Sequence, residues 1–192
     1  MGKREEQKEQ RYQLIITKAL ELFVTKGYRE TKISDIAQAA HMSTGLLFHY
    51  FESKEKLYEA LVRMGLEGTK TPARIEAHTP PEYFSNFLDT LFAYVKEQPW
   101  VGWMFVLMAQ AWRGYGTPEH IRELARQVDQ VEQSARIIAK GQEEGYFREG
   151  DPYALSNTFW CSVQGIMERL AAIPDMPLPK TEWLLSILTG KT

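Results

Sequence analysis

The stretch from Thr31 to Lys54, TKISDIAQAAHMSTGLLFHYFESK, constrains the fold of this 192-residue chain more than any other. It contains two short helical patterns separated by a tight polar turn, followed by the start of another helix. This order is typical of a helix-turn-helix, whose second helix lies in the major groove of DNA. The sequence therefore predicts a DNA-binding helix-turn-helix in the first third of the chain.

The first helix of this motif is expected to begin after Thr31, which would be its N-cap. Its buried face has the spacing of three and four residues that marks one side of a helix: Ile33, Ile36, Ala37 and Ala40. The helix is expected to stop at His41, because histidine is one of the few residues other than glycine that is enriched in the left-handed conformation of such turns.

The second helix is expected to run from Thr44 to about Phe51, with Ser43 as its cap and with Leu47 and Phe51 facing inward. Its other face has small residues at the leading end and polar or aromatic residues behind them, which suits a helix that enters a groove. Leu46 could contact a thymine methyl group, and His49 a phosphate or a base edge. The predicted DNA contacts are Thr31, Ser43, Thr44, Gly45, Leu46, Phe48, His49, Tyr50 and Lys54.

Two helices flank the motif. An amphipathic pattern predicts a helix from Arg11 to Lys26 that ends at Gly27, and residues 1–10 either fray or extend this helix into solvent. After the motif, Ser53 is expected to cap a longer helix that opens with Lys54. A cation at a helix N-terminus is electrostatically unfavourable, which favours a partner outside the helix, such as a DNA phosphate.

Three motifs in order, ALELFVTKGY, TKISDIA and HMSTGLLFHYFESK, resemble the DNA-binding domain of TetR-family transcriptional repressors. The resemblance covers about the first third of the chain. Three positions depart from the family pattern: His41 stands where glycine is usual, Leu46 where a small hydroxyl residue is usual, and Phe48 where tyrosine is usual. Without the phenol, Phe48 loses one expected hydrogen bond to a phosphate.

The resemblance implies the architecture and the partners. It implies an all-α protein with a DNA-binding domain, residues 1–52, and a helical ligand-binding and dimerisation domain, residues 53–192. It also implies a homodimer that packs through its two C-terminal helices, represses from a palindromic double-stranded operator and is released by a small-molecule effector.

Beyond the motif, the pattern is helical throughout, and Gly65 to Pro81 reads as a helix end followed by a loop. Proline or aspartate at the starts and glycine or proline at the stops indicate the helix ends. The expected helices are 81–97, 100–113, 118–145, 152–172 and 180–188.

Aromatic and sulfur-containing residues concentrate in this second part. The helix at 100–113 is apolar nearly all round, so we expect it to be central in the bundle. Its residues either fill a core or line an adaptable cavity for a mainly hydrophobic or aromatic effector, and the sequence does not separate the two readings. The candidate ligand contacts are Phe92, Trp103, Met104, Met108, Trp112, Trp160, Gln164 and Met167.

Nothing in the sequence indicates an enzyme. The chain lacks a nucleophile elbow, a phosphate-binding loop and a zinc-protease motif, and its four histidines lack metal-ligand spacing, so neither a cofactor nor a metal is expected. Cys161 is expected to be buried and inert. With no apparent signal peptide and no apolar run long enough to cross a bilayer, we expect a cytoplasmic protein that does not enter the membrane.

Two other functions are compatible with the sequence. The helical domain of a DNA-bound adaptor would recruit a protein partner instead of a small molecule, and its aromatic side chains would then be exposed. Alternatively, a helical enzyme or ligand carrier could have retained the N-terminal module.

Overall fold

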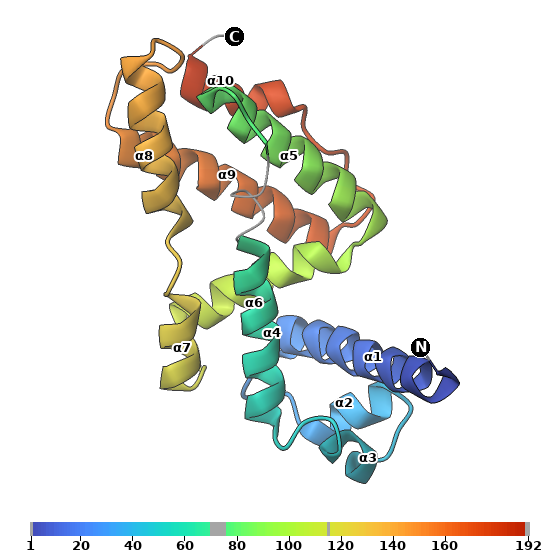
Figure 1. The fold of residues 1–192 in the computed structure, drawn as a ribbon. Coiled ribbons are helices and arrows are strands. Elements are labelled where there is room, and N and C mark those ends of the chain that lie inside the picture. The colour runs from blue at the N-terminus through green and yellow to red at the C-terminus, as the bar shows by residue number, and fades with distance from the viewer. Residues whose placement is uncertain (1, 70–75, 115, 191–192) are drawn as a thin grey trace. The chain divides into compact units, whose positions relative to one another are not determined.

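A computed structural model describes residues 2–69, 76–114 and 116–190 of the chain. Within these ranges all regular structure is helical, in ten helices, and the predicted all-α fold is confirmed (Figure 1). Packing divides the chain into two compact units: the first unit is Met1–Leu66 with Trp103–Gln127, and the second unit is Glu67–Gly102 with Val128–Thr192. The predicted boundary between residues 52 and 53 concerns function and stays a prediction.

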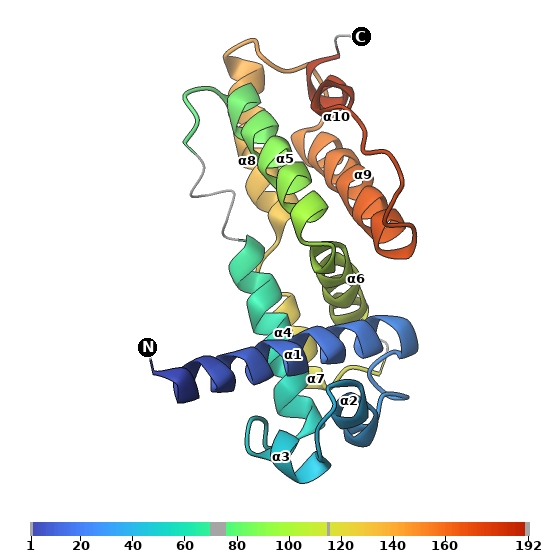
Figure 2. The ribbon, with the colours of Figure 1, turned by 90° about the vertical axis from the view of Figure 1, so that its right-hand side faces the viewer.

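The first unit contains the helix-turn-helix. Its helices are α1 (Lys3–Lys26), α2 (Ile33–Ala39), α3 (Thr44–Phe48), α4 (Lys54–Thr69, up to Leu66), α6 (Trp100–Arg113, from Trp103) and α7 (Glu119–Ala125). α2 packs on α1 and on α3 (Figure 2). Of the two possibilities for residues 1–10, helix extension is the one found, because α1 already begins at Lys3.

The turn between α2 and α3 has the predicted chemistry. His41 has a φ of 54°, the left-handed conformation, and is the one non-glycine residue with a positive φ in the part of the chain that the structure describes. The Ser43 hydroxyl accepts a hydrogen bond from the Leu46 amide at 3.1 Å, which caps α3. Leu47 is fully buried and Phe51 is nearly so, as predicted.

Two details of the motif differ from the prediction. α2 begins at Ile33, and its N-cap is Lys32 instead of Thr31, with no side-chain hydrogen bond to the helix. α3 ends at Phe48, three residues before Phe51. Lysine has no acceptor to offer an N-terminal amide, so this end of α2 lacks a side-chain cap.

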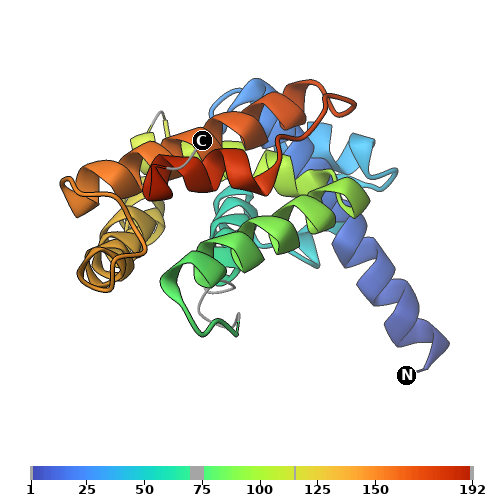
Figure 3. The same ribbon diagram turned by 90° about the horizontal axis from the view of Figure 1, so that it is seen from above.

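The second unit consists of α5 (Pro80–Glu97), α8 (Gln130–Glu143), α9 (Pro152–Ala172) and α10 (Thr181–Thr189), together with the ends of α4 and α6. α9 packs against α8 and α10, and α10 packs against α5, as Figure 3 shows from above. The rings of Phe84 and Phe159 meet edge to face, 5.1 Å between centroids, in the core between α5 and α9.

The single helix expected from Pro118 to Gly145 is wrong, because the chain forms α7 and α8 there with a break between them. Asp129 causes the second start: its carboxylate accepts a hydrogen bond from the Glu132 amide at 3.0 Å and caps α8. Aspartate side chains compete for backbone amides and therefore favour helix starts over helix interiors.

Two expectations about burial are also wrong. Trp112 at the end of α6 is 54% exposed, with the Arg126 guanidinium over its ring at 5.2 Å, so α6 is not enclosed along its whole length. Cys161 is exposed, because it lies on the side of α9 that faces away from its neighbours. No helix among the described residues combines the length and the apolar character needed to cross a membrane.

We expect His41→Gly to raise the free energy of unfolding by up to about 1 kcal/mol, because glycine adopts a positive φ without the steric cost that an L side chain meets. Chemical denaturation measures the change. The matched control, Gln38→Gly on the exposed side of α2, should lower stability by about 1 kcal/mol. Destabilisation by both changes would show that His41 makes contacts that outweigh its strain.

Candidate DNA-binding site

α3 presents one face outward. Successive residues of a helix are 100° apart, and with Leu47 buried, Gly45 and His49 lie at the centre of the opposite side. Leu46 and Phe48 flank that centre on either side. Phe48 is 47% exposed and Leu46 is half-buried.

The predicted contacts that gather on this face or at its ends are Ser43, Thr44, Gly45, Leu46, Phe48, His49 and Tyr50. Of these, Ser43, Gly45, Phe48 and His49 are exposed, whereas Thr44, Leu46 and Tyr50 are half-buried. The backbone behind them is held by the cap at Ser43 and by Phe51, whose ring stacks on Tyr12 of α1 at 5.4 Å between centroids. A groove-reading surface needs such a fixed frame behind it.

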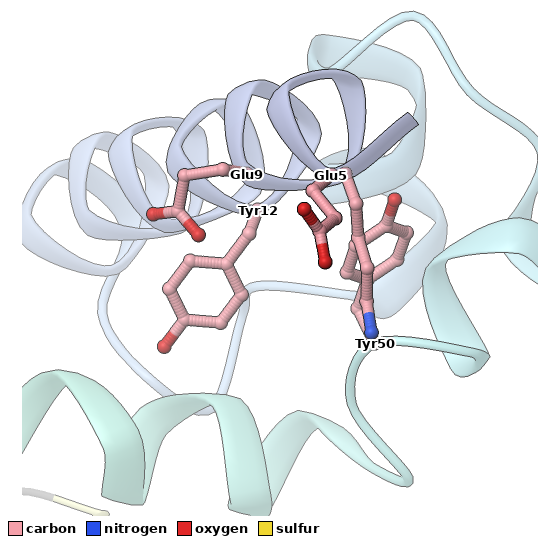
Figure 4. A pocket seen from close by; sticks show the side chains of 5 residues that line it. Glu5, Glu9, Tyr12 and Tyr50 are labelled. Atoms are coloured by element: carbon pink, nitrogen blue, oxygen red, sulfur yellow. The ribbon is translucent and has the colours of Figure 1, made fainter. Parts of the chain in front are cut away.

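Tyr50 lies at one end of this face beside an open hollow of about 360 Å³. The hollow is lined by Glu5, Lys8, Glu9, Tyr12 and Tyr50, and Figure 4 shows the Glu5 carboxylate beside the Tyr50 ring and the Glu9 carboxylate beside the Tyr12 ring. Two carboxylates and one lysine give the hollow a net negative charge. The sequence reading did not foresee this acidic border, which weakens the attraction of a phosphate to Tyr50.

Thr31 is placed differently from the prediction. Its side chain is fully buried, and its hydroxyl donates to the carbonyls of Gly27 at 2.7 Å and Leu22 at 3.1 Å. These bonds tie the loop after α1 to the end of that helix. The geometry therefore gives Thr31 a structural role and no support as a DNA contact.

Lys54 is also engaged inside the first unit. Its ammonium donates to the carbonyls of Tyr28 at 2.8 Å and Thr31 at 2.9 Å, with Arg29 at 3.4 Å, and it lies 4.3 Å from the centre of the Tyr28 ring. Burial lowers the pKa of this ammonium from its ordinary value, and the Glu30 carboxylate partly offsets that shift. The reason for a cation at the start of α4 is thus an internal one: it joins α4 to the loop between α1 and α2.

The candidate ligand contacts fall in both units. In the first unit, Met104 is buried, Trp103 and Met108 are half-buried, and Met108 packs directly on Gly65 of α4, so closely that a Cβ at Gly65 would clash with the thioether. Trp112 is exposed, as described above. These side chains pack against their neighbours within the unit, so core packing accounts for Met104 and Met108.

In the second unit, Phe92 and Met167 belong to the buried core. The Trp160 indole donates to the Ser134 hydroxyl at 2.9 Å and lies 5.1 Å from the Phe87 ring. The Gln164 amide donates to the Glu168 carboxylate at 2.9 Å. As effector contacts, all eight candidates stay predictions.

The sequence gives no sign of a contact in the first unit between a histidine and two carboxylates. His120 of α7 lies 3.5 Å from the Glu55 carboxylate and 4.0 Å from that of Glu59, both on α4. Residues 65 positions apart in the sequence give no local signal of such a contact. The described residues hold no group of three or more histidine, cysteine or acidic side chains able to bind a metal ion.

Lys54→Met tests the internal role of Lys54. The change keeps most of the aliphatic stem but leaves three carbonyls without their charged donor, so we expect a loss of about 2 kcal/mol in the free energy of unfolding. The slope of DNA affinity against salt concentration should not change, whereas loss of a phosphate contact would reduce it by about 1. Lys56→Met is the control, because Lys56 binds Glu59 at the surface. A reduced salt slope in Lys54→Met with unchanged stability would contradict the assignment.

Residues 15–61, which span the second half of α1 to the first half of α4, match the family described as "Bacterial regulatory proteins, tetR family". The uncharacterised HTH-type transcriptional regulator YfiR of Bacillus subtilis (strain 168) is 26% identical over 169 residues, which are 85% of this chain and 81% of YfiR. The HTH-type transcriptional regulator RutR of Escherichia coli (strain K12) is 26% identical over 85% of this chain and 76% of its own length.

Solved structures share the fold. The MbdR regulator from Azoarcus sp. CIB superposes with a TM-score of 0.78 at 21% identity, over 95% of this chain and 99% of MbdR. AibR, crystallised in complex with isovaleryl coenzyme A and operator DNA, superposes with a TM-score of 0.66 at 20% identity, over 91% of this chain and 93% of AibR.

The sequence match therefore covers the DNA-binding helices, while the relatives and solved structures extend the likeness over most of the chain. The family consists of transcriptional regulators, which are not enzymes. The helix-turn-helix geometry and these likenesses agree: residues 15–61 carry the DNA-binding module of the TetR family, and the chain as a whole is similar to DNA-binding transcriptional regulators of that family.

Proposed function

We propose that the protein is a homodimeric repressor that binds a palindromic operator through α3 and is released from it by a small, mainly hydrophobic or aromatic effector. The observation that carries the proposal is the outward face of α3, on which Gly45, Phe48 and His49 are exposed while Leu47 anchors the helix to the core. Two copies related by a two-fold axis would place their α3 helices in successive major grooves, roughly 34 Å apart.

The outward side of α9 supports a homodimer. Four exposed residues recur on it at every fourth position: Tyr153, Asn157, Cys161 and Gly165. Trp183 on the neighbouring helix α10 is 63% exposed. A Cβ at Gly165 would meet no atom within 4 Å, so the chain leaves this point free for a close approach by a second helix.

The effector is proposed from composition and from a structural relative. AibR, which shares the fold, was crystallised with both operator DNA and the small molecule isovaleryl coenzyme A. In this chain, the partly exposed aromatic side chains among the candidates are Trp103, Trp112 and Trp160. Aromatic and apolar linings favour ligands of the same character.

Release of the operator requires that effector binding and DNA binding favour different conformers of the protein. An effector can lower operator affinity only by the factor by which it prefers the conformer that does not fit DNA. In a dimer, such a conformer needs no change inside α3, because a different separation of the two reading helices is enough to prevent simultaneous binding of both half-sites.

Sequence-specific DNA binding through α3 is tested by letting the purified protein select fragments of genomic DNA at a stated salt concentration. We expect enrichment of a palindrome whose half-sites are centred about 10 base pairs apart. His49→Ala should weaken binding to this palindrome at least tenfold, because His49 lies at the centre of the exposed face, whereas His78→Ala in the second unit should bind like the wild type. A bound pool without sequence preference would contradict a specific repressor.

Gly165→Glu tests the dimer. The side chain has room in the monomer but would place a charge in the proposed interface, so we expect a dimer by sedimentation for the wild type and a monomer for the variant. Gly68→Glu, at another helical position where a Cβ meets nothing within 4 Å, is the control and should remain a dimer. If Gly165→Glu remained a dimer, the dimer interface would have to lie elsewhere than on this side of α9.

A further inference from the structure

Gly45 is a glycine that the fold does not require. It lies within α3 without a positive φ, and a Cβ built there would meet only the Ser43 hydroxyl, at 4.0 Å. In a helix, alanine is more stable than glycine. The fold therefore does not explain the glycine at this position. A partner molecule that approaches the helix backbone closely would explain it.

The two residues beside Gly45 and His49 on the outward face are apolar. Neither Leu46 nor Phe48 can donate or accept a hydrogen bond, yet Phe48 is 47% exposed. An apolar side chain on a groove-reading surface gains nothing from phosphates or from polar base edges. The 5-methyl group of thymine is the apolar group that the major groove displays.

We propose that α3 reads thymine methyl groups: the gap at Gly45 lets the helix lie close to the base pairs, and Leu46 and Phe48 contact thymine methyl groups on either side of it. This specificity rests on the proposed function, since it applies to the operator that α3 binds. It assigns a preference for thymine in each half-site, with His49 left to read a polar group between the two apolar contacts.

The first test uses the selected palindrome with each thymine of one half-site replaced in turn by deoxyuridine, which removes only the methyl group. We expect at least one replacement to lower the affinity of the wild-type protein about fourfold, the factor that corresponds to one buried methyl-sized group. The same replacement in flanking DNA is the control. If no replacement within the half-site changes affinity by as much as twofold, the methyl readout is wrong while the specific operator stands.

The side chain responsible is identified by a double-mutant cycle. In Phe48→Ala, the operator with thymine and the operator with deoxyuridine at the sensitive position should bind equally, and Leu46→Ala should do the same at a second position. If the methyl effect persists in both variants, another residue reads the methyl group and the assignment to Leu46 and Phe48 is overturned.

Gly45→Ala tests the close approach, because its effects on folding and on DNA are expected to have opposite signs. The variant should be at least as stable as the wild type to denaturant and should bind the selected operator at least tenfold more weakly. Gly68→Ala, an equally uncrowded helical position outside α3, should keep full affinity. Unchanged operator affinity in Gly45→Ala would overturn the role of the gap, and failure to select any operator would instead reject the proposed function.

Discussion

A helix of five residues is not stable in water by itself, because the cost of nucleating a helix is recovered only over many more residues. α3 has this length, so its existence depends on the side chains that attach it to the first unit. Leu47 supplies the anchor by complete burial, and the cap at Ser43 supplies the start. The proposed DNA specificity therefore depends on Leu47 and Ser43. These two residues fix the orientation of the four residues on the outward face of α3: Gly45, Leu46, Phe48 and His49.

Local chemistry explains what the sequence predicts well. The left-handed turn at His41, the cap at Ser43 and the inward side of α3 each depend on residues within a few positions of one another, and all three are found as predicted. The break before α8 is also local, but an aspartate inside an otherwise helical pattern is ambiguous, since Asp129 could lie within a helix or begin one. The pattern alone favours continuation, and the structure shows a new start.

Long-range partners explain what the sequence misses. Lys54 and Thr31 are polar residues in a motif where polar residues are expected to face DNA, yet both bind backbone carbonyls inside the first unit. For Lys54, those carbonyls are more than 20 residues away in the sequence. The contact of His120 with Glu55 and the exposure of Cys161 likewise depend on which helices pack together. Periodicity locates a helix and its apolar side, but it does not identify the partner of a polar side chain.

The division into two units limits how the DNA-binding part of the chain could be transferred to another protein. The chain leaves the first unit after Leu66, returns to it at Trp103 and leaves again after Gln127. A continuous N-terminal fragment would therefore lack the helical segment whose Met108 packs on Gly65 and would expose that glycine surface of α4 to water. A chimera that carries this DNA specificity to another regulator would need two separate pieces of the chain, so α3 and its neighbours would have to be transferred together with most of α6 and with α7.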